Sequence, residues 1–111
     1  MSKAKIIGVS MVKFAKPGAN EPYEVMGAKA IQGALNDAGI GYHEVEQAFA
    51  SYVYGDSTCG QRVAYSVGMT GIPVFNLNNY CASGSSALLL ARQAVAAGLV
   101  ECAAAFGLQE M

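Results

Sequence analysis

Three cysteines are the residues of this chain best suited to nucleophilic chemistry, and Cys81 has the most informative surroundings. It follows an Asn-Asn-Tyr segment at the end of an alternating apolar and polar run, and Ala-Ser-Gly-Ser-Ser and a long apolar stretch come after it. This pattern predicts a thiol at a helix N-terminus, at the carboxyl end of a parallel strand. Active sites of open α/β sheets lie outside the carboxyl ends of strands, and the helix dipole favours a thiolate. Cys81 is therefore the candidate nucleophile.

The helix dipole alone does not make Cys81 a committed nucleophile. It contributes about 0.3–1 kcal/mol, or up to ~2 kcal/mol when partly buried. A base or an imidazolium partner must supply the remaining activation. Gly84, three residues on, leaves room for a substrate carbonyl to approach the backbone N–H groups of the first helical turn. The residues by themselves leave open a cysteine that only caps a helix.

The other candidate side chains fit structural roles. The single histidine, His43, precedes the second expected strand and so belongs to the amino edge of the sheet, about 20 Å from Cys81 across six residues of strand. Cys59 sits in an ordinary Gly-Asp-Ser-Thr-Cys-Gly loop, and Cys102 lies inside the last expected strand as a small apolar side chain. No metal-ligand spacing, phosphate-binding glycine pattern or GxSxG sequence is present.

The elements that must position Cys81 alternate between strands and helices. Apolar runs predict strands at residues 5–9, 44–54, 74–79 and 100–108, and helices at residues 22–38, 60–69 and 82–97. The order is β-α-β-α-β-α-β, and its short connections imply a mostly parallel sheet with right-handed crossover helices. The fold class is therefore α/β.

Composition excludes several classes of protein. Charged residues make up 14% of the 111 residues, against ~25% in an average soluble domain. The net charge of −1, with no run of Lys or Arg, argues against nucleic-acid binding. No segment approaches the ~18 consecutive apolar residues of a membrane span. Three cysteines without a pairing pattern, in a chain without a recognisable signal peptide, favour a reducing compartment.

The expected helix at residues 82–97 is unusually poor in polar side chains. Apart from the serines near its N-terminus, only Arg92 and Gln93 are polar. A helix that is apolar all round is buried all round. A crossover helix of a one-sheet domain buries a single face, so the composition predicts that a second layer or another molecule covers the opposite face. A mildly Ala-rich, exposed helix is the alternative.

Three segments, residues 53–62, 68–73 and 79–87, carry a resemblance to a known family. The last of them reads Asn-Tyr-Cys-Ala-Ser-Gly-Ser-Ser-Ala. Together they closely resemble the thiolases of the sterol carrier protein x and lipid-transfer type, and the likeness runs along essentially the whole chain. The Cys-Ala-Ser-Gly stretch is similar to the thiolase nucleophile motif. The resemblance implies that Cys81 takes an acyl group from an acyl-CoA as a thioester.

The resemblance also implies the architecture and the partners of the whole protein. In thiolases two similar α/β halves stack their nucleophile-bearing helices between two sheets, in five layers (αβαβα). Thiolases are homodimers whose third strands pair, and the corresponding strand here is residues 74–78, from Val74 to Asn78. Acyl-CoA or coenzyme A is the implied substrate, with no bound cofactor and no metal. The implied location is cytoplasmic, or peroxisomal in a eukaryote.

By this resemblance, residues 1–111 are expected to be a fragment of the thiolase N-terminal domain, with the loop domain and the C-terminal domain absent. The C-terminal histidine and second cysteine that activate and protonate in thiolases have no counterpart here, so the fragment is expected to be inactive alone. The whole enzyme would cleave 3-oxoacyl-CoA by thiolysis or run the reverse Claisen condensation. Two alternatives stay open: a thiolase-like aldolase of steroid side-chain degradation, which works with a small OB-fold partner, and a non-enzymatic lipid-binding or structural remnant.

Overall fold

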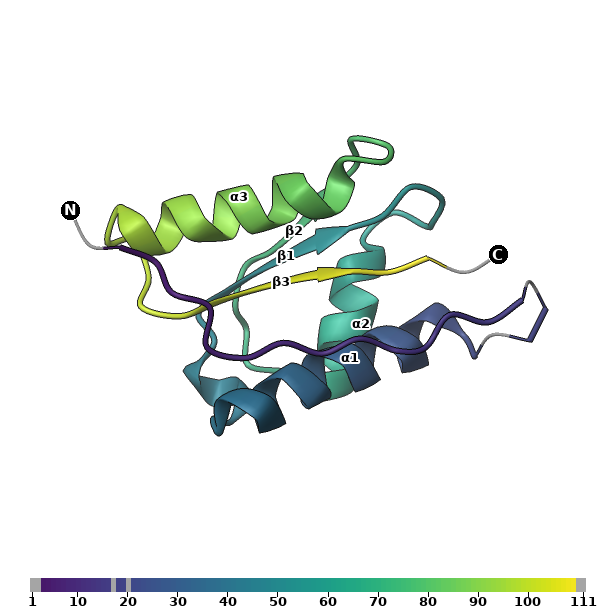
Figure 1. The fold of residues 1–111 in the computed structure, drawn as a ribbon, viewed down its shortest axis with the longest axis horizontal. Coiled ribbons are helices and arrows are strands. Elements are labelled where there is room, and N and C mark those ends of the chain that lie inside the picture. The colour runs from purple at the N-terminus through teal and green to yellow at the C-terminus, as the bar shows by residue number, and fades with distance from the viewer. Residues whose placement is uncertain (1–2, 17, 20, 110–111) are drawn as a thin grey trace.

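The centre of the fold is a sheet of three parallel strands. The computed structural model describes residues 3–16, 18–19 and 21–109 (Figure 1). β1 (Gln47–Ser51) lies between β2 (Val74–Leu77) and β3 (Ala103–Gly107), so the strand order is β2-β1-β3. The register places Phe49 of β1 opposite Phe75 of β2. The expected parallel α/β sheet is confirmed.

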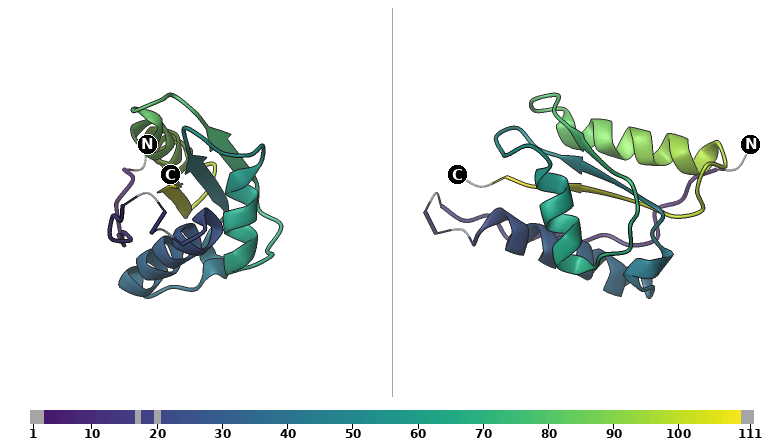
Figure 2. Two further views of the ribbon diagram at one scale, coloured as in Figure 1. Left: turned by 90° about the vertical axis from the view of Figure 1, so that its right-hand side faces the viewer. Right: turned by 180° about the vertical axis from the view of Figure 1, so that it is seen from behind.

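Helices cover both faces of this sheet. α1 (Tyr23–Ala38) and α2 (Cys59–Val67) lie on one face, and α3 (Ser83–Ala96) lies on the other (Figures 1 and 2). A short 3₁₀ helix, η1 (Tyr42–Glu44), precedes β1. The three α-helices begin and end within two residues of their expected positions. Across the described residues, no helix combines the length and apolar character needed to cross a membrane.

The ends of α1 follow from local chemistry. Pro22 precedes the first helical residue, where its missing N–H costs no intrahelical hydrogen bond. Gly39 ends the helix in the left-handed conformation, with φ of +74°. Its N–H donates to the carbonyls of Leu35 and Asn36 at 2.9 and 3.2 Å. A glycine adopts this conformation without the steric penalty of a Cβ atom, which explains why the helix ends here.

The apolar side chains form one core on each face of the sheet. The core on the α1 and α2 side consists of Ile31, Leu35, Val45, Ala50, Cys59, Val63 and Leu108. The core beneath α3 consists of Phe49, Ala87, Ala91, Ala94 and Val100. Phe49 and Ala50 are neighbours in β1 and point into different cores, because successive side chains of a strand face opposite sides of the sheet.

α3 buries a single face within this chain. Its buried residues, Ser83, Ala87, Ala91 and Ala94, recur at helical spacing and contact the sheet. On the opposite side, Leu88 and Leu89 are 51% and 50% exposed. The chain alone thus leaves this second face of α3 uncovered. A second layer or a second molecule over Leu88 and Leu89 stays a prediction.

The expected first strand, at residues 5–9, is wrong. This segment is extended but pairs with no strand, so the described sheet has three strands where the sequence predicted four. Ile6, Ile7 and Val9 are exposed by 71%, 58% and 67%. The Val9 N–H donates to the Asp37 carboxylate near the end of α1, at 2.9 Å. The physical reason is packing on α1: a Cβ atom at Gly8 would lie 2.8 Å from the Ala38 Cβ atom, so this segment lies against the helix and does not pair with the outer edge of β2 or β3.

Candidate active site

Cys81 lies at the carboxyl edge of the sheet, where the sequence predicted it. β2 ends at Leu77, and three residues separate it from Cys81. The cysteine is exposed, and α3 begins two residues later at Ser83, with Ala82 as its N-cap. The thiol therefore stands just before the helix rather than inside its first turn. In the described part of the chain, no histidine or carboxylate hydrogen-bonds to Cys81.

The residue before Cys81 adopts an unusual backbone conformation. Tyr80 has φ of +49°, in the left-handed region that residues with a Cβ atom rarely enter. The Tyr80 N–H donates to the side-chain oxygen of Asn78 at 3.1 Å. The Ala82 N–H donates to the Asn79 carbonyl at 3.0 Å, which closes the turn around Cys81. The turn at residues 78–82 thus sets the orientation of Cys81 relative to the end of β2.

Ser83 joins this turn to the end of β1. Its side-chain oxygen accepts the Asn79 N–H at 2.7 Å and donates its one proton to the Tyr80 carbonyl at 2.7 Å. The Tyr52 carbonyl is a second, longer acceptor for the same proton, at 3.3 Å. Ser83 is 4% exposed. Sequence reasoning treated it only as one of several serines at a helix start. Its place two residues after the candidate nucleophile was a signal in the sequence. Its contact with Tyr52 could not be predicted, because Tyr52 is distant in the sequence.

Gly84 leaves the first turn of α3 open, as expected. It is exposed, and a Cβ atom at this position would meet only the Ser51 side-chain oxygen, at an ordinary contact distance of 3.9 Å. Packing therefore does not require glycine here. The open space agrees with the idea that a substrate group approaches the backbone at this point.

Cys59 belongs to the core and not to the surface of this edge. It is the first residue of α2 and is 1% exposed, and burial raises the pKa of its thiol. Asn76 of β2 holds the beginning of α2: its side-chain oxygen accepts the Gly60 N–H at 2.7 Å, and its NH₂ donates to Gln61 at 2.6 Å. Cys59 therefore begins α2 and does not lie in a loop, which corrects the expected position, and its burial favours a structural role.

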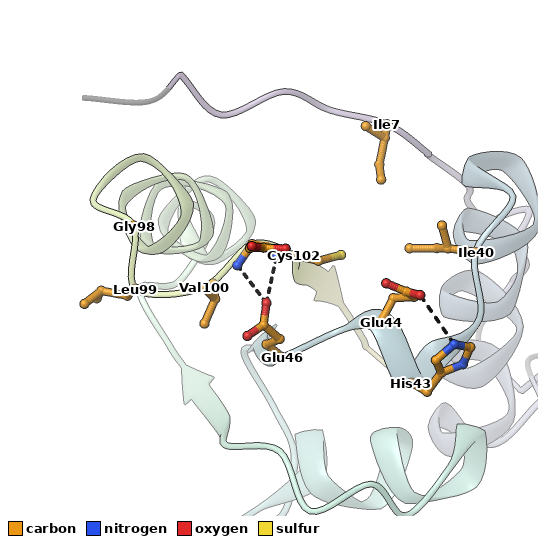
Figure 3. A pocket seen from close by; sticks show the side chains of 10 residues that line it. Ile7, Ile40, His43, Glu44, Glu46, Gly98, Leu99, Val100 and Cys102 are labelled. Atoms are coloured by element: carbon orange, nitrogen blue, oxygen red, sulfur yellow. Dashed lines mark hydrogen bonds and ion pairs between the residues drawn. The ribbon is translucent and has the colours of Figure 1, made fainter.

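His43 and Cys102 lie at the opposite, amino edge, beside a cavity of about 530 Å³ (Figure 3). His43 is exposed in η1 and lies 3.4 Å from the Glu44 carboxylate. Cys102 directly precedes β3 and is not inside it, which corrects the expected position. Burial, and then the charges of Glu44 and Glu46, raise the pKa of the Cys102 thiol. Protonated at neutral pH, it is a poor nucleophile.

The residues around this cavity do not form a metal centre. Glu46 accepts the backbone N–H groups of Glu101 and Cys102 at 2.7 and 3.3 Å, so its carboxylate is engaged in fixing the start of β3 (Figure 3). Among the described residues, no group of three His, Cys, Asp or Glu side chains is arranged to hold a metal ion. Cys81 does not line this cavity, so the candidate nucleophile and the cavity belong to different edges of the sheet.

The fold of this chain is similar to part of a solved ketosynthase structure. It matches the crystal structure of the priming β-ketosynthase from the R1128 polyketide biosynthetic pathway with a TM-score of 0.64 and 28% sequence identity. The match covers 72% of this chain and 25% of the ketosynthase chain. The three-layered α/β arrangement is therefore part of the thiolase fold.

The chain belongs to the thiolase family, because residues 4–111 match the family model of the thiolase N-terminal domain. It is 54% identical over 108 residues to sterol carrier protein 2 of Gallus gallus, a match that covers 96% of this chain and 20% of the relative. It is 32% identical over 99 residues to the mitochondrial acetyl-CoA acetyltransferase of Mus musculus, covering 84% of this chain and 23% of that protein. The chain thus spans about one fifth of the length of the curated relatives it matches.

Proposed function

We propose that this chain supplies the nucleophile of a thiolase, with Cys81 as the residue that carries the acyl group. The observation that carries the proposal is the position of Cys81: an exposed thiol at the carboxyl end of a parallel strand, directly before a helix, in a chain of the thiolase family. The proposed substrate is a 3-oxoacyl-CoA, and coenzyme A is a reactant and not a resident cofactor. The kinship to sterol carrier protein 2 favours a lipid or sterol acyl chain.

In the proposed thiolysis, the Cys81 thiolate attacks the 3-oxo carbon. The C2–C3 bond then breaks, the acyl group stays on sulfur as a thioester, and the electron pair leaves with acetyl-CoA, which takes up a proton at C2. Attack by the thiol of coenzyme A on the thioester releases the shortened acyl-CoA and restores Cys81. The reverse sequence is the Claisen condensation. Activation of the thiol and protonation at C2 need an acid and a base, and we assign these to residues beyond the 111 of this chain.

We further propose that the whole protein is a homodimer joined through the strand at residues 74–78. β2 is an edge strand, with β1 as its one neighbour in the described sheet. Phe75 on this strand is 44% exposed and stacks on Phe49 with ring centroids 5.3 Å apart. An apolar edge strand offers unpaired backbone groups to a second copy. For location we propose the cytoplasm, or the peroxisome in a eukaryote.

The test of the function uses a full-length protein that contains this chain. Cys81→Ser is expected to abolish thiolysis of acetoacetyl-CoA, whereas Cys102→Ser, as the matched control, is expected to retain it. Acyl-CoA is expected to protect Cys81 from alkylation by iodoacetamide. Thiolysis that survives in Cys81→Ser overturns the proposal, and an aldol cleavage that survives in the same variant favours the aldolase alternative.

A further inference from the structure

Tyr80 is held in a conformation that it would not adopt by itself. At φ of +49°, its Cβ atom crowds its own carbonyl oxygen, a cost that glycine avoids and that Asn or Asp offsets by local hydrogen bonds. The Tyr80 side chain is 73% exposed, so burial of the ring does not account for the conformation. The surrounding hydrogen bonds must therefore hold the backbone in place.

The buried Ser83 hydroxyl makes the shortest of these bonds. It accepts the Asn79 N–H and donates to the Tyr80 carbonyl, both at 2.7 Å, so it holds the peptide group before Asn79 and the one after Tyr80. The Tyr52 carbonyl at 3.3 Å connects the same hydroxyl to the end of β1. Ser83 is the first residue of α3, after the N-cap Ala82. Its partners all precede the helix, which distinguishes it from an ordinary helix-capping serine.

We propose that Ser83 is a positioning residue for Cys81: its hydroxyl holds Tyr80 in the left-handed conformation that turns the Cys81 thiol out of the end of β2 into solvent. This inference rests on the proposed role of Cys81 as the nucleophile. Without the hydroxyl, Tyr80 relaxes to an ordinary conformation and the thiol leaves its outward position for part of the time. Ser83 does not touch the substrate and acts through the backbone of the turn.

The test measures the rate at which iodoacetamide modifies Cys81 in this chain, followed by mass spectrometry of the Cys81 peptide. Ser83→Ala is expected to slow the reaction by roughly threefold to tenfold, the factor that one net hydrogen bond gives. Ser66→Ala is the matched control, because its hydroxyl also bonds a backbone carbonyl, at 3.0 Å, but within α2. This control is expected to leave the rate unchanged.

Rescue by a second substitution separates positioning from a general loss of structure. Tyr80→Gly removes the Cβ crowding, so the double variant Ser83→Ala/Tyr80→Gly is expected to regain most of the reactivity of Cys81. Backbone NMR shifts of Tyr80 are expected to show its φ leaving the left-handed region in Ser83→Ala. An unchanged rate and an unchanged φ in Ser83→Ala overturn the proposal, and so does a slowed rate that Tyr80→Gly fails to restore.

Asn78→Ala covers the case in which Ser83→Ala does not fold. Asn78 is exposed, and its side-chain oxygen holds the Tyr80 N–H, so its loss loosens the same turn without opening the core. It is expected to slow Cys81 alkylation, with the same rescue by Tyr80→Gly, and failure of either result counts against the proposal. Alkylation needs no catalytic turnover. The positioning role of Ser83 is therefore refuted separately from the role of Cys81: alkylation tests the first, and thiolysis by Cys81→Ser tests the second.

Discussion

The two glycines inside α1 are expected to respond oppositely to the same substitution. A Cβ atom at Gly27 would lie 2.6 and 2.9 Å from the two methyl groups of Val63 in α2, and Val63 is 0% exposed. A Cβ atom at Gly33 would meet the side chain of Ser10, on the exposed N-terminal segment. Val63 is fixed by the core, whereas Ser10, whose Cβ atom would lie 2.9 Å away, moves aside only with a shift of the exposed segment that carries it.

The magnitudes follow from two opposing contributions. Replacing a helical glycine with alanine stabilises a helix by about 1 kcal/mol, and this gain applies at both positions. Overpacking a buried contact costs about 1–3 kcal/mol, and this cost applies in full at Gly27. At Gly33 the shift of an exposed segment takes back only part of the gain. Gly33→Ala is therefore expected to raise the free energy of unfolding by up to ~1 kcal/mol. Gly27→Ala is expected to lower it by ~0–2 kcal/mol.

Urea unfolding followed by circular dichroism measures both variants, and the double variant Gly27→Ala/Val63→Ala gives the coupling between the two sites. Trimming Val63 makes room for the new methyl group, so the double variant is expected to be more stable than the sum of the two single effects. If Gly27→Ala stabilises the protein as much as Gly33→Ala does, the close packing of α1 on α2 is wrong.

Three further predictions concern the cysteines and the amide contact at α2. This chain alone is expected to show no thiolysis of acetoacetyl-CoA above a Cys81→Ser control, and measurable turnover would mean that a base near Cys81 has been overlooked. Burial raises the pKa of the Cys59 thiol in the folded state, so the free energy of unfolding is expected to fall as the pH rises past the ordinary thiol value of 9.0. Urea unfolding at pH 8 and pH 10 measures this loss, which is expected to be larger than in Cys59→Ala. An equal loss in the two proteins would contradict the prediction. Asn76→Ala removes the acceptor of the Gly60 N–H and is expected to cost about 1–3 kcal/mol in the same assay, with Asn36→Ala on the exposed face of α1 as a near-neutral control.

The sequence by itself determined the order and the limits of the helices and the edge at which Cys81 lies. These features depend on contacts between residues near one another in the chain: helical spacing in α1 and α3, a glycine at the end of α1, and alternation in β2. Because parallel strands share one carboxyl edge, the element order alone predicted that Cys81 and His43 would lie on opposite edges of the sheet. The thiolase family was recognisable from short motifs, and the family match confirms it.

Only the tertiary structure decided which segments became strands and how Cys81 is presented. Residues 5–9 have the composition of a strand, but they lie against the end of α1 and not on the sheet, and this choice involves segments about 30 residues apart in the chain. The left-handed Tyr80 depends on Ser83, whose hydroxyl reaches Tyr52, 31 residues earlier in the sequence. Local patterns report the conformations that a segment can adopt. The choice among them depends on which distant partners satisfy its backbone groups, and that information exists only once the chain has folded.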